Sequence, residues 1–434
     1  MSLVTFGTEI SGTEDTTLGD RLTTVEGESS PYEDPEDGVK PSSAHGSGES
    51  DDYPPLNIND EALKHIAECY LPATHGKCVE VCKLEGGTYH EICLLEFEDE
   101  WTCIARLTRN KRENTTVTES EIETRRFVRR HTSIPVPETY FANLDPANAV
   151  GAPFVLMEDM KGYQLAIMWN ALKTDYRLKV LAEIARVIAQ LARLHFNKFG
   201  SLRPGGAVGR LQNKTIPDHE PGRGPFSTTN DFMKSFLKDD AGRSAEVMAL
   251  YTETRAELAQ YMATQKDNAF LNPPYRLLHG DFDSQNMLFT WDSPSEPPRL
   301  SAIIDWDFSY TGPLDELYEY PIFIQDSDLE PELYSENKLL RKEFVRMLAQ
   351  NFPKHSEERR QVRQCFRDKM FPLRGFYGTF AARIWTRQDV ELSIVKLYLE
   401  ELRNQRTGKE TLPPYNGRHD WQPDSELESG DEES

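Results

Sequence analysis

Residues 277–289 of this chain read LLHGDFDSQNMLF and residues 302–307 read AIIDWD, and these two runs are its most informative part. Each run holds a short apolar segment of the length expected for a buried strand. Polar residues stand at the ends of these segments: Asp281 and Asn286 come before the first, and Asp305 follows the second. The region therefore offers two carboxylates and one amide at the edges of small apolar strands.

The spacing predicts that these three side chains come close together. Asp281 and Asn286 lie five residues apart, across a loop that leads into an apolar strand at 287–289. Asp305 ends the next strand, at 300–304. If the two strands pair as a hairpin, Asn286 and Asp305 come within reach of one ion. An ordinary loop of turn-forming Asp and Asn is the alternative.

Two carboxylates and an amide in this order suit phosphoryl transfer from Mg²⁺-ATP. That reaction needs the phosphate, the metal and the acceptor oxygen held in line, with their charge neutralised. One carboxylate orients the acceptor hydroxyl and accepts its proton. The amide oxygen and the second carboxylate bind the metal, which prefers oxygen ligands.

The same residues resemble the signature of aminoglycoside phosphotransferases and related small-molecule kinases, a family with a two-lobed, protein-kinase-like fold. The runs HGD and IDW, with Asn286 between them, carry the resemblance. It implies that Asp281 is the catalytic base and that Asn286 and Asp305 are Mg²⁺ ligands. It groups His279 with the nucleotide site, as a scaffold residue of the catalytic loop. For Asp307, a structural role is at least as compatible with its position as a catalytic one.

The resemblance extends upstream in the same linear order, from about residue 75 to residue 385. It implies that Arg106, on the third expected strand, binds the α- and β-phosphates and that Glu121 is its helix partner. It also implies that the adenine hinge lies at Glu158 and Met160, directly after the strand FVLME.

Two positions depart from the pattern of the wider kinase fold. Arg106 stands where that fold normally has Lys; distant members of the resembled family in fungi often carry Arg here. Because Arg keeps its charge and binds phosphate through a wider fork, a clamp of altered geometry is expected, and a surface Arg on an edge strand is the alternative. Gly86 and Gly87 take the place of the glycine-rich loop but lack the spaced glycines of protein kinases, so an ordinary hairpin turn is the alternative there.

The expected elements predict an α+β protein with two lobes. The first lobe is a small antiparallel sheet with one interrupting helix: strands at 78–84, 91–97, 101–107, 139–143 and 153–158, and a helix at 119–131. The second is larger and helical, with helices expected at 245–265, 333–351, 357–369 and 390–403, interrupted by strands at 276–279, 286–290 and 300–305. We place the nucleotide-binding lobe at 59–158 and the catalytic and substrate lobe at 159–412. Acidic tails at 1–58 and 413–434 are too poor in apolar residues to fold, so we expect them to be disordered.

The net charge of −23 arises mostly in the tails. Residues 1–60 carry 14 acidic and 2 basic side chains, and residues 419–434 carry 7 acidic and none basic, so the 358 residues between them carry only −4. This distribution says little about the substrate, and the absence of a basic stripe argues against nucleic-acid binding. No run of apolar residues is long enough to span a membrane.

The beginning of the chain predicts a cytoplasmic protein. No basic segment there leads into a long apolar one, and acidic residues follow soon after. These features argue against a secretory signal and a mitochondrial presequence. Among the six cysteines, Cys78 and Cys82 with His75 suggest a metal site, but no second pair completes it. We therefore expect reduced, mostly buried cysteines.

These observations predict an ATP- and Mg²⁺-dependent phosphotransferase that transfers the γ-phosphate to a hydroxyl of a small molecule. The alternative is a catalytically weak, kinase-like binding or scaffold protein that uses its acidic tails for partners. A protein kinase is disfavoured because the long segment between Glu158 and Asp281 better suits a small-molecule pocket. The sequence does not identify the acceptor, the oligomeric state or the partners of the tails.

Overall fold

The computed structural model describes residues 55–84, 90–109, 115–212, 223–237, 243–327, 330–367, 376 and 388–409. The predictions made for Gly86 and Gly87 lie outside these residues. Most of the two acidic tails, residues 1–54 and 413–434, also lies outside them.

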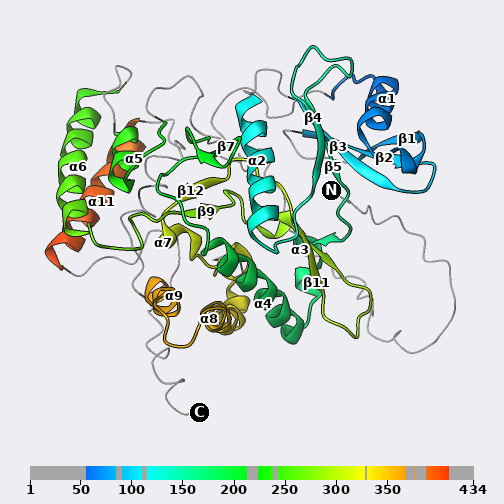
Figure 1. Ribbon diagram of the computed structural model, residues 1–434. Helices are drawn as coiled ribbons and strands as arrows, with labels where there is room; N and C mark the ends of the chain where they lie inside the picture. Colours follow the sequence, from blue (N-terminus) through cyan, green and yellow to red (C-terminus); the bar gives the residue numbers. More distant parts are fainter. Residues whose placement is uncertain are drawn as a thin grey trace, which may run out of the picture.

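A five-stranded antiparallel sheet forms the first part of the fold, with strand order β1-β2-β3-β5-β4 (Figure 1). We call this sheet and its two helices the small lobe. Its elements are α1 (Asp60–Tyr70), the 3₁₀ turn η1 (Ala73–His75), β1 (Cys78–Leu84), β2 (His90–Phe97), β3 (Thr102–Thr108), α2 (Thr115–His131), β4 (Thr139–Asn143) and β5 (Phe154–Glu158). The predicted strands are all present, and β1 and β4 have the predicted bounds.

The two faces of this sheet are covered by different helices because successive side chains on a strand point to opposite sides. Cys103 and Ala105 of β3 share a buried cluster with Leu63 of α1. Ile104, between them, packs instead with Ile122 of α2. Arg106 follows Ile104 by two residues and therefore lies on the face covered by α2.

The large lobe follows β5 and is mainly helical, as predicted (Figure 1). Its helices are α3 (Leu165–Met168), α4 (Thr174–Leu191), α5 (Thr229–Phe236), α6 (Ala245–Thr264), α7 (Leu314–Leu317), α8 (Tyr334–Gln350), α9 (Glu357–Arg367) and α11 (Gln388–Thr407). Its strands are β6 (Tyr163–Gln164), β7 (Leu202–Arg203), β8 (Ala207–Val208), β9 (Arg276–Leu278), β10 (Met287–Thr290), β11 (Arg299–Ile303) and β12 (Tyr310–Gly312). Its 3₁₀ turns are η2 (Trp169–Ala171), η3 (Ser284–Asn286), η4 (Ile322–Ile324) and η5 (Pro331–Leu333).

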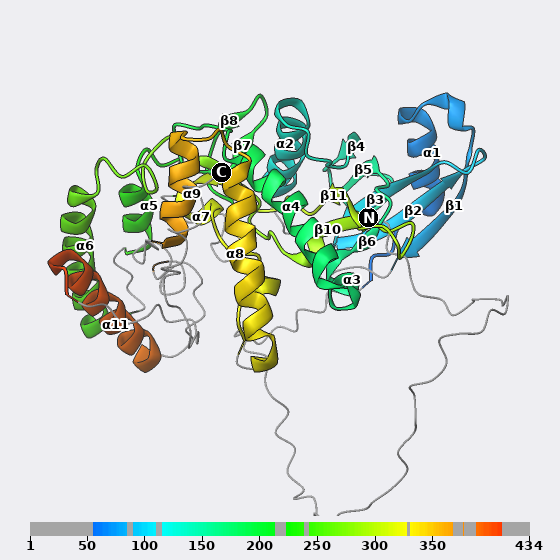
Figure 2. The ribbon, with the colours of Figure 1, turned by 90° about the horizontal axis from the view of Figure 1, so that it is seen from below.

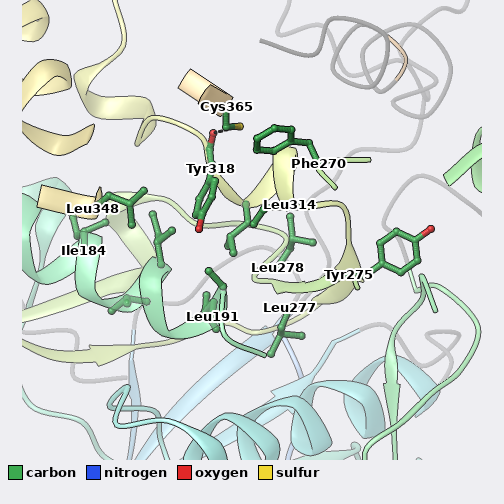
Figure 3. Packing of buried hydrophobic residues seen from close by; sticks show 14 of the residues in the cluster. Ile184, Leu191, Phe270, Tyr275, Leu277, Leu278, Leu314, Tyr318, Leu348 and Cys365 are labelled. Carbon is green, nitrogen blue, oxygen red and sulfur yellow. Dashed lines mark hydrogen bonds between the residues drawn. The ribbon is translucent and has the colours of Figure 1, made fainter. Parts of the chain in front are cut away.

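The core of the large lobe forms around α4, where Leu181, Ile184, Ile188 and Leu191 recur at helical spacing and are buried. Figure 3 shows Ile184 and Leu191 of α4 among side chains from β9 and α8, including Leu277 and Leu348. Full burial of each such side chain stabilises the fold by about 1.5–3 kcal/mol. Because β9 leads directly into the loop that carries His279 and Asp281, this core fixes the beginning of that loop.

Helix α2 connects the small lobe to the large lobe. The backbone carbonyl of Thr116 accepts a hydrogen bond from Arg203 Nη1 of β7 at 3.3 Å. Phe127 lies 5.4 Å, between ring centroids, from Phe196 of the large lobe. In Figure 1, α2 stands between the sheet and the large lobe. The helix begins four residues before its predicted start, and this first turn carries the contact to β7.

The helices farthest from the small lobe, α6 and α11, lie side by side in both views (Figures 1 and 2). Arg403 and Arg406 of α11 each form an ion pair with Glu257 of α6. No helix among the described residues combines the length and the apolar character that crossing a membrane requires.

Candidate active site

The hairpin of β10 and β11 places Asn286 beside Asp305. The two strands pair antiparallel, with Met287 opposite Ile303. One step further, the N–H of Ile304 donates a hydrogen bond to the backbone carbonyl of Asn286 at 2.9 Å. Asp305 follows Ile304 directly, so the predicted hairpin is confirmed.

Asp281 is fixed against Asn286 by the Asn286 side chain. Nδ2 of Asn286 donates to the backbone carbonyl of Asp281 at 2.9 Å and to its carboxylate Oδ2 at 3.2 Å. Asn286 is buried, whereas Asp281 is half-buried. An amide that donates through Nδ2 retains Oδ1 as an acceptor, which is the atom that a cation would need.

The backbone at both ends of this site takes a left-handed conformation. Gly280 has φ +84°, and a Cβ there would lie only 2.8 Å from the carbonyl oxygen of Phe308. Only glycine fits this close approach between the loop that carries Asp281 and the segment after β11. Asp305 has φ +62°, a conformation that few residues other than glycine adopt. Backbone strain of this kind clusters at functional sites.

His279 links the loop that carries Asp281 to the end of β11. Its Nε2–H donates to the backbone carbonyl of Ile304 at 2.9 Å, and its Nδ1 accepts from the N–H of Asp281 at 3.4 Å. Its ring packs 4.5 Å, between centroids, from the indole of Trp306, which is fully buried. His279 is itself 2% exposed, so its position is that of a scaffold residue.

Burial lowers the pKa of His279 to about 4, against the opposing effects of its bond to Ile304 and the nearby Asp281 carboxylate. A histidine in the unfolded chain titrates near pH 6.5. Above that pH the side chain is neutral in both states and contributes no pH dependence. Below it, protons bind only to the unfolded state, so we expect stability to fall as pH is lowered from about 6.5 to about 4.

The expected loss from this group between pH 7 and pH 5 is about 2 kcal/mol. Urea unfolding of the wild type and of His279→Gln at both pH values measures it. The variant starts less stable, but its loss on acidification should be smaller by about 2 kcal/mol. An equal loss in both proteins would assign the pH dependence to other groups.

Arg106 is the centre of a buried ion-pair network. Its Nη1 donates to Glu121 Oε2 of α2 at 2.7 Å, so the predicted partner is in contact. Its Nη2 donates to Asp305 Oδ1 at 3.2 Å and also contacts Asp307 Oδ2. Arg106 is 8% exposed, which rules out the alternative of a surface arginine. The network joins the small lobe to the segment that follows β11.

Two further side chains complete the network. His90 of β2 lies 3.0 Å through Nε2 from Asp307 Oδ2. Arg125 of α2, 1% exposed, lies 3.3 Å through Nε from Glu121 Oε1. Neither His90 nor Arg125 is expected at the site from the sequence. The pairing of β2 with β3 indicates why His90 lies near this network. Ile92 pairs with Arg106, and His90 lies two residues before Ile92 on the same face of the sheet.

The charges of Arg106 and Asp307 stabilise one another, whereas burial raises the pKa of Glu121 and lowers that of Arg125. Burial by itself would lower the pKa of Arg106, but Asp307, Glu121 and Asp305 raise it above its usual value. Burial would likewise raise the pKa of Asp307, but Arg106 and the His90 hydrogen bond hold it well below its usual range. Arg106 is therefore a guanidinium and Asp307 a carboxylate at neutral pH.

The predicted hinge lies beside an apolar surface. Met160 packs against Leu288, Ala302 and Ile304, which are buried side chains of the β10–β11 hairpin and its end. Glu158 is oriented by its neighbours: Oε2 accepts from the N–H of Glu138 at 3.0 Å. Residues immediately after β5 thus contact the same hairpin that carries Asn286 and Asp305.

Comparison with models of known protein families gives a match over more than half of the chain. Residues 80–316, more than half of the chain, match the phosphotransferase enzyme family. The matched stretch begins in β1 and ends in α7, so it includes every candidate residue described above.

Curated relatives match over shorter stretches. A subtelomeric hrmA-associated cluster protein of Aspergillus fumigatus is 30% identical over 126 residues, which are 29% of this chain and 25% of that protein. Altered inheritance of mitochondria protein 9 of Kluyveromyces lactis is 27% identical over 138 residues, which are 29% of this chain and 22% of that protein. The chain thus spans about a quarter of the length of these relatives.

Solved structures are similar over most of their length at low sequence identity. An ADP-bound aminoglycoside phosphotransferase, APH(2'')-Ib, has a TM-score of 0.47 and 12% identity, covering 79% of this chain and 97% of that one. A microcompartment-associated aminopropanol kinase has a TM-score of 0.41 and 16% identity, covering 79% of this chain and 98% of that one.

Proposed function

Because the chain belongs to the phosphotransferase enzyme family, we propose that it transfers the γ-phosphate of ATP to a hydroxyl group of a small molecule. The observation that carries the proposal is the linked set of Asp281, Asn286 and Asp305. Asn286 contacts Asp281 through its side chain and pairs through its backbone with the residue before Asp305. One hairpin and one loop thus hold the proposed base and the two proposed metal ligands together.

In this proposal Asp281 orients the acceptor hydroxyl and accepts its proton. Its carboxylate is half-buried, so it is accessible, and the Asn286 amide fixes one of its oxygens. A fixed carboxylate can hold the hydroxyl in line with the phosphate, which is the main contribution that protein makes to this reaction.

The donor set at Asn286 and Asp305 fits Mg²⁺. An amide oxygen and a carboxylate are hard oxygen ligands, and Mg²⁺ in phosphoryl-transfer sites takes only one or two protein ligands and completes its shell with water and phosphate. Asp305 already contacts a cation, Arg106, and about a third of its side chain is exposed. When bound, Mg²⁺ would neutralise phosphate charge. Arg106 would bind the phosphates from the side of the small lobe, and the apolar surface around Met160 and Leu288 would support the adenine.

The nucleotide part of the proposal predicts thermal stabilisation by Mg²⁺-ATP. A ligand at 100 times its dissociation constant stabilises the folded state by about 2.7 kcal/mol, which raises the melting temperature by several degrees. We expect this shift at millimolar ATP with Mg²⁺ and a smaller one when EDTA replaces Mg²⁺. No shift at millimolar nucleotide would contradict the proposal and favour the binding or scaffold alternative.

The transfer itself is tested by acceptor-dependent ADP release with a panel of hydroxylated metabolites, using Asp281→Asn as the blank. The panel should include sugars, amino alcohols and aminoglycosides, since the comparisons do not decide among them. At least one acceptor should raise ADP release in the wild type but not in Asp281→Asn.

The cytoplasmic location predicted from the sequence remains a prediction, which fractionation of cells that express the chain would test.

A further inference from the structure

The Arg106 guanidinium contacts carboxylates from both lobes. Nη1 donates to Glu121, which belongs to the small lobe, and Nη1 (at 3.5 Å) and Nη2 both contact the carboxylate of Asp307, which belongs to the large lobe. Asp307 is in turn held by His90 of the small lobe at 3.0 Å. Glu121 is 3% exposed and Asp307 is 9% exposed, so both depend on protein partners rather than on water.

A lysine at position 106 cannot reproduce the contact to Asp307. Its ammonium is a single nitrogen, whereas the guanidinium is a planar fork with five N–H donors. Both terminal nitrogens of Arg106 contact the Asp307 carboxylate, Nη1 at Oδ1 (3.5 Å) and Nη2 at Oδ2, while Nη1 also donates to Glu121. A lysine that stayed on Glu121 would contact at most one oxygen of Asp307 and would leave this buried carboxylate less well compensated. An uncompensated buried carboxylate is strongly destabilising.

We propose that Asp307 is a positioning residue that makes arginine, rather than lysine, the working cation at position 106. Together with His90 and Glu121 it holds the guanidinium in one orientation, which fixes the position of the positive charge that the phosphate groups of the nucleotide would face. The consequence for nucleotide binding rests on the proposed function, while the pairing itself does not. Asp307 acts through Arg106 and requires no contact with the substrate.

The test is a double-mutant cycle of Arg106→Lys and Asp307→Asn, read as the dissociation constant of Mg²⁺-ATP. Each single variant should weaken Mg²⁺-ATP binding by about tenfold or more, because each disrupts the contact between residues 106 and 307. The double variant should bind no more than about threefold more weakly than Arg106→Lys, because Asp307 has no effect once the fork is gone. A residue with only a structural role would instead multiply the two losses.

A matched control uses a second bidentate arginine–aspartate pair, which lies entirely within the large lobe. Arg341 donates to both carboxylate oxygens of Asp326, each at 2.8 Å, and the Asp326 side chain is as buried as that of Asp307. Asp326→Asn should lower the melting temperature but leave the Mg²⁺-ATP dissociation constant within about twofold, in either background at position 106.

His90 provides a second arm of the test. His90→Gln keeps a side-chain donor and should retain most of the affinity, whereas His90→Leu removes the donor and should weaken Mg²⁺-ATP binding in the Arg106 background only. Multiplicative losses in the cycle, or an equal effect of His90→Leu on the Arg106→Lys background, would overturn the positioning role while leaving the proposed function intact. Failure of the wild type to bind Mg²⁺-ATP would overturn both.

Discussion

Asp281→Asn should lower kcat by about 10²- to 10⁴-fold on the true acceptor, the range typical for loss of a general base. The KM for Mg²⁺-ATP should change by less than about threefold, because the proposed role of Asp281 concerns the acceptor oxygen and not the nucleotide. Steady-state ADP release at saturating ATP, with acceptor varied, separates these two quantities.

The substitution is informative because it leaves the local structure in place. The carboxylate oxygen that Asn286 contacts can be replaced by an amide oxygen of the same shape, and the second contact of Asn286 is to the Asp281 backbone. The melting temperature should therefore remain close to that of the wild type. Only the ability to accept a proton is lost.

Asp283→Asn is the matched control in the same loop. Asp283 Oδ1 accepts from the N–H of Ser284 at 2.6 Å and caps the turn η3, a role that asparagine fills equally well. Its turnover should stay within about threefold of the wild type. If Asp281→Asn retained more than a tenth of the wild-type kcat, Asp281 would not be the base, and a fall of equal size in both variants would indicate loop damage instead.

The sequence predicted the hairpin and its polar ends because the information there is local. Short apolar strands separated by turn-forming residues pair with their neighbours, and side-chain alternation then decides which residues share an end. The contact between Arg106 and Glu121 was predicted only through the resemblance to a family. It depends on a helix and a strand that meet in space, which periodicity alone does not reveal.

The contacts of Asp307, His90 and Arg125 could not be predicted from the sequence. Asp307 was left between a structural and a catalytic role because its partners lie about 200 residues away in the sequence. The charged helix over 119–131 gave no sign that Glu121 and Arg125 are buried, since charged residues are rarely buried unless paired. They are buried because α2 packs between the sheet and β7, which is a property of the assembled fold.

The second prediction with a large expected effect concerns the contribution of Glu121 to the free energy of unfolding. This carboxylate lies between two buried guanidinium groups, Arg106 at 2.7 Å and Arg125 at 3.3 Å. Burial lowers the pKa of Arg125, and the Glu121 carboxylate acts against that effect. Arg106 has other carboxylate partners, but Glu121 supplies the only ion pair of Arg125 found among the described residues. Removing the charge of Glu121 therefore leaves a buried cation uncompensated.

Glu121→Gln should reduce the free energy of unfolding by about 3–5 kcal/mol, the cost of breaking a buried ion pair by removing one partner. Glu119→Gln, on the exposed side of the same helix, is the control and should change it by less than about 0.5 kcal/mol. Adding Arg125→Met to Glu121→Gln should recover part of the loss, because methionine removes the uncompensated charge and keeps most of the volume. Urea unfolding of the four proteins measures all three quantities. A loss below about 1 kcal/mol for Glu121→Gln, or a further loss on adding Arg125→Met, would mean that the two arginines do not depend on this carboxylate.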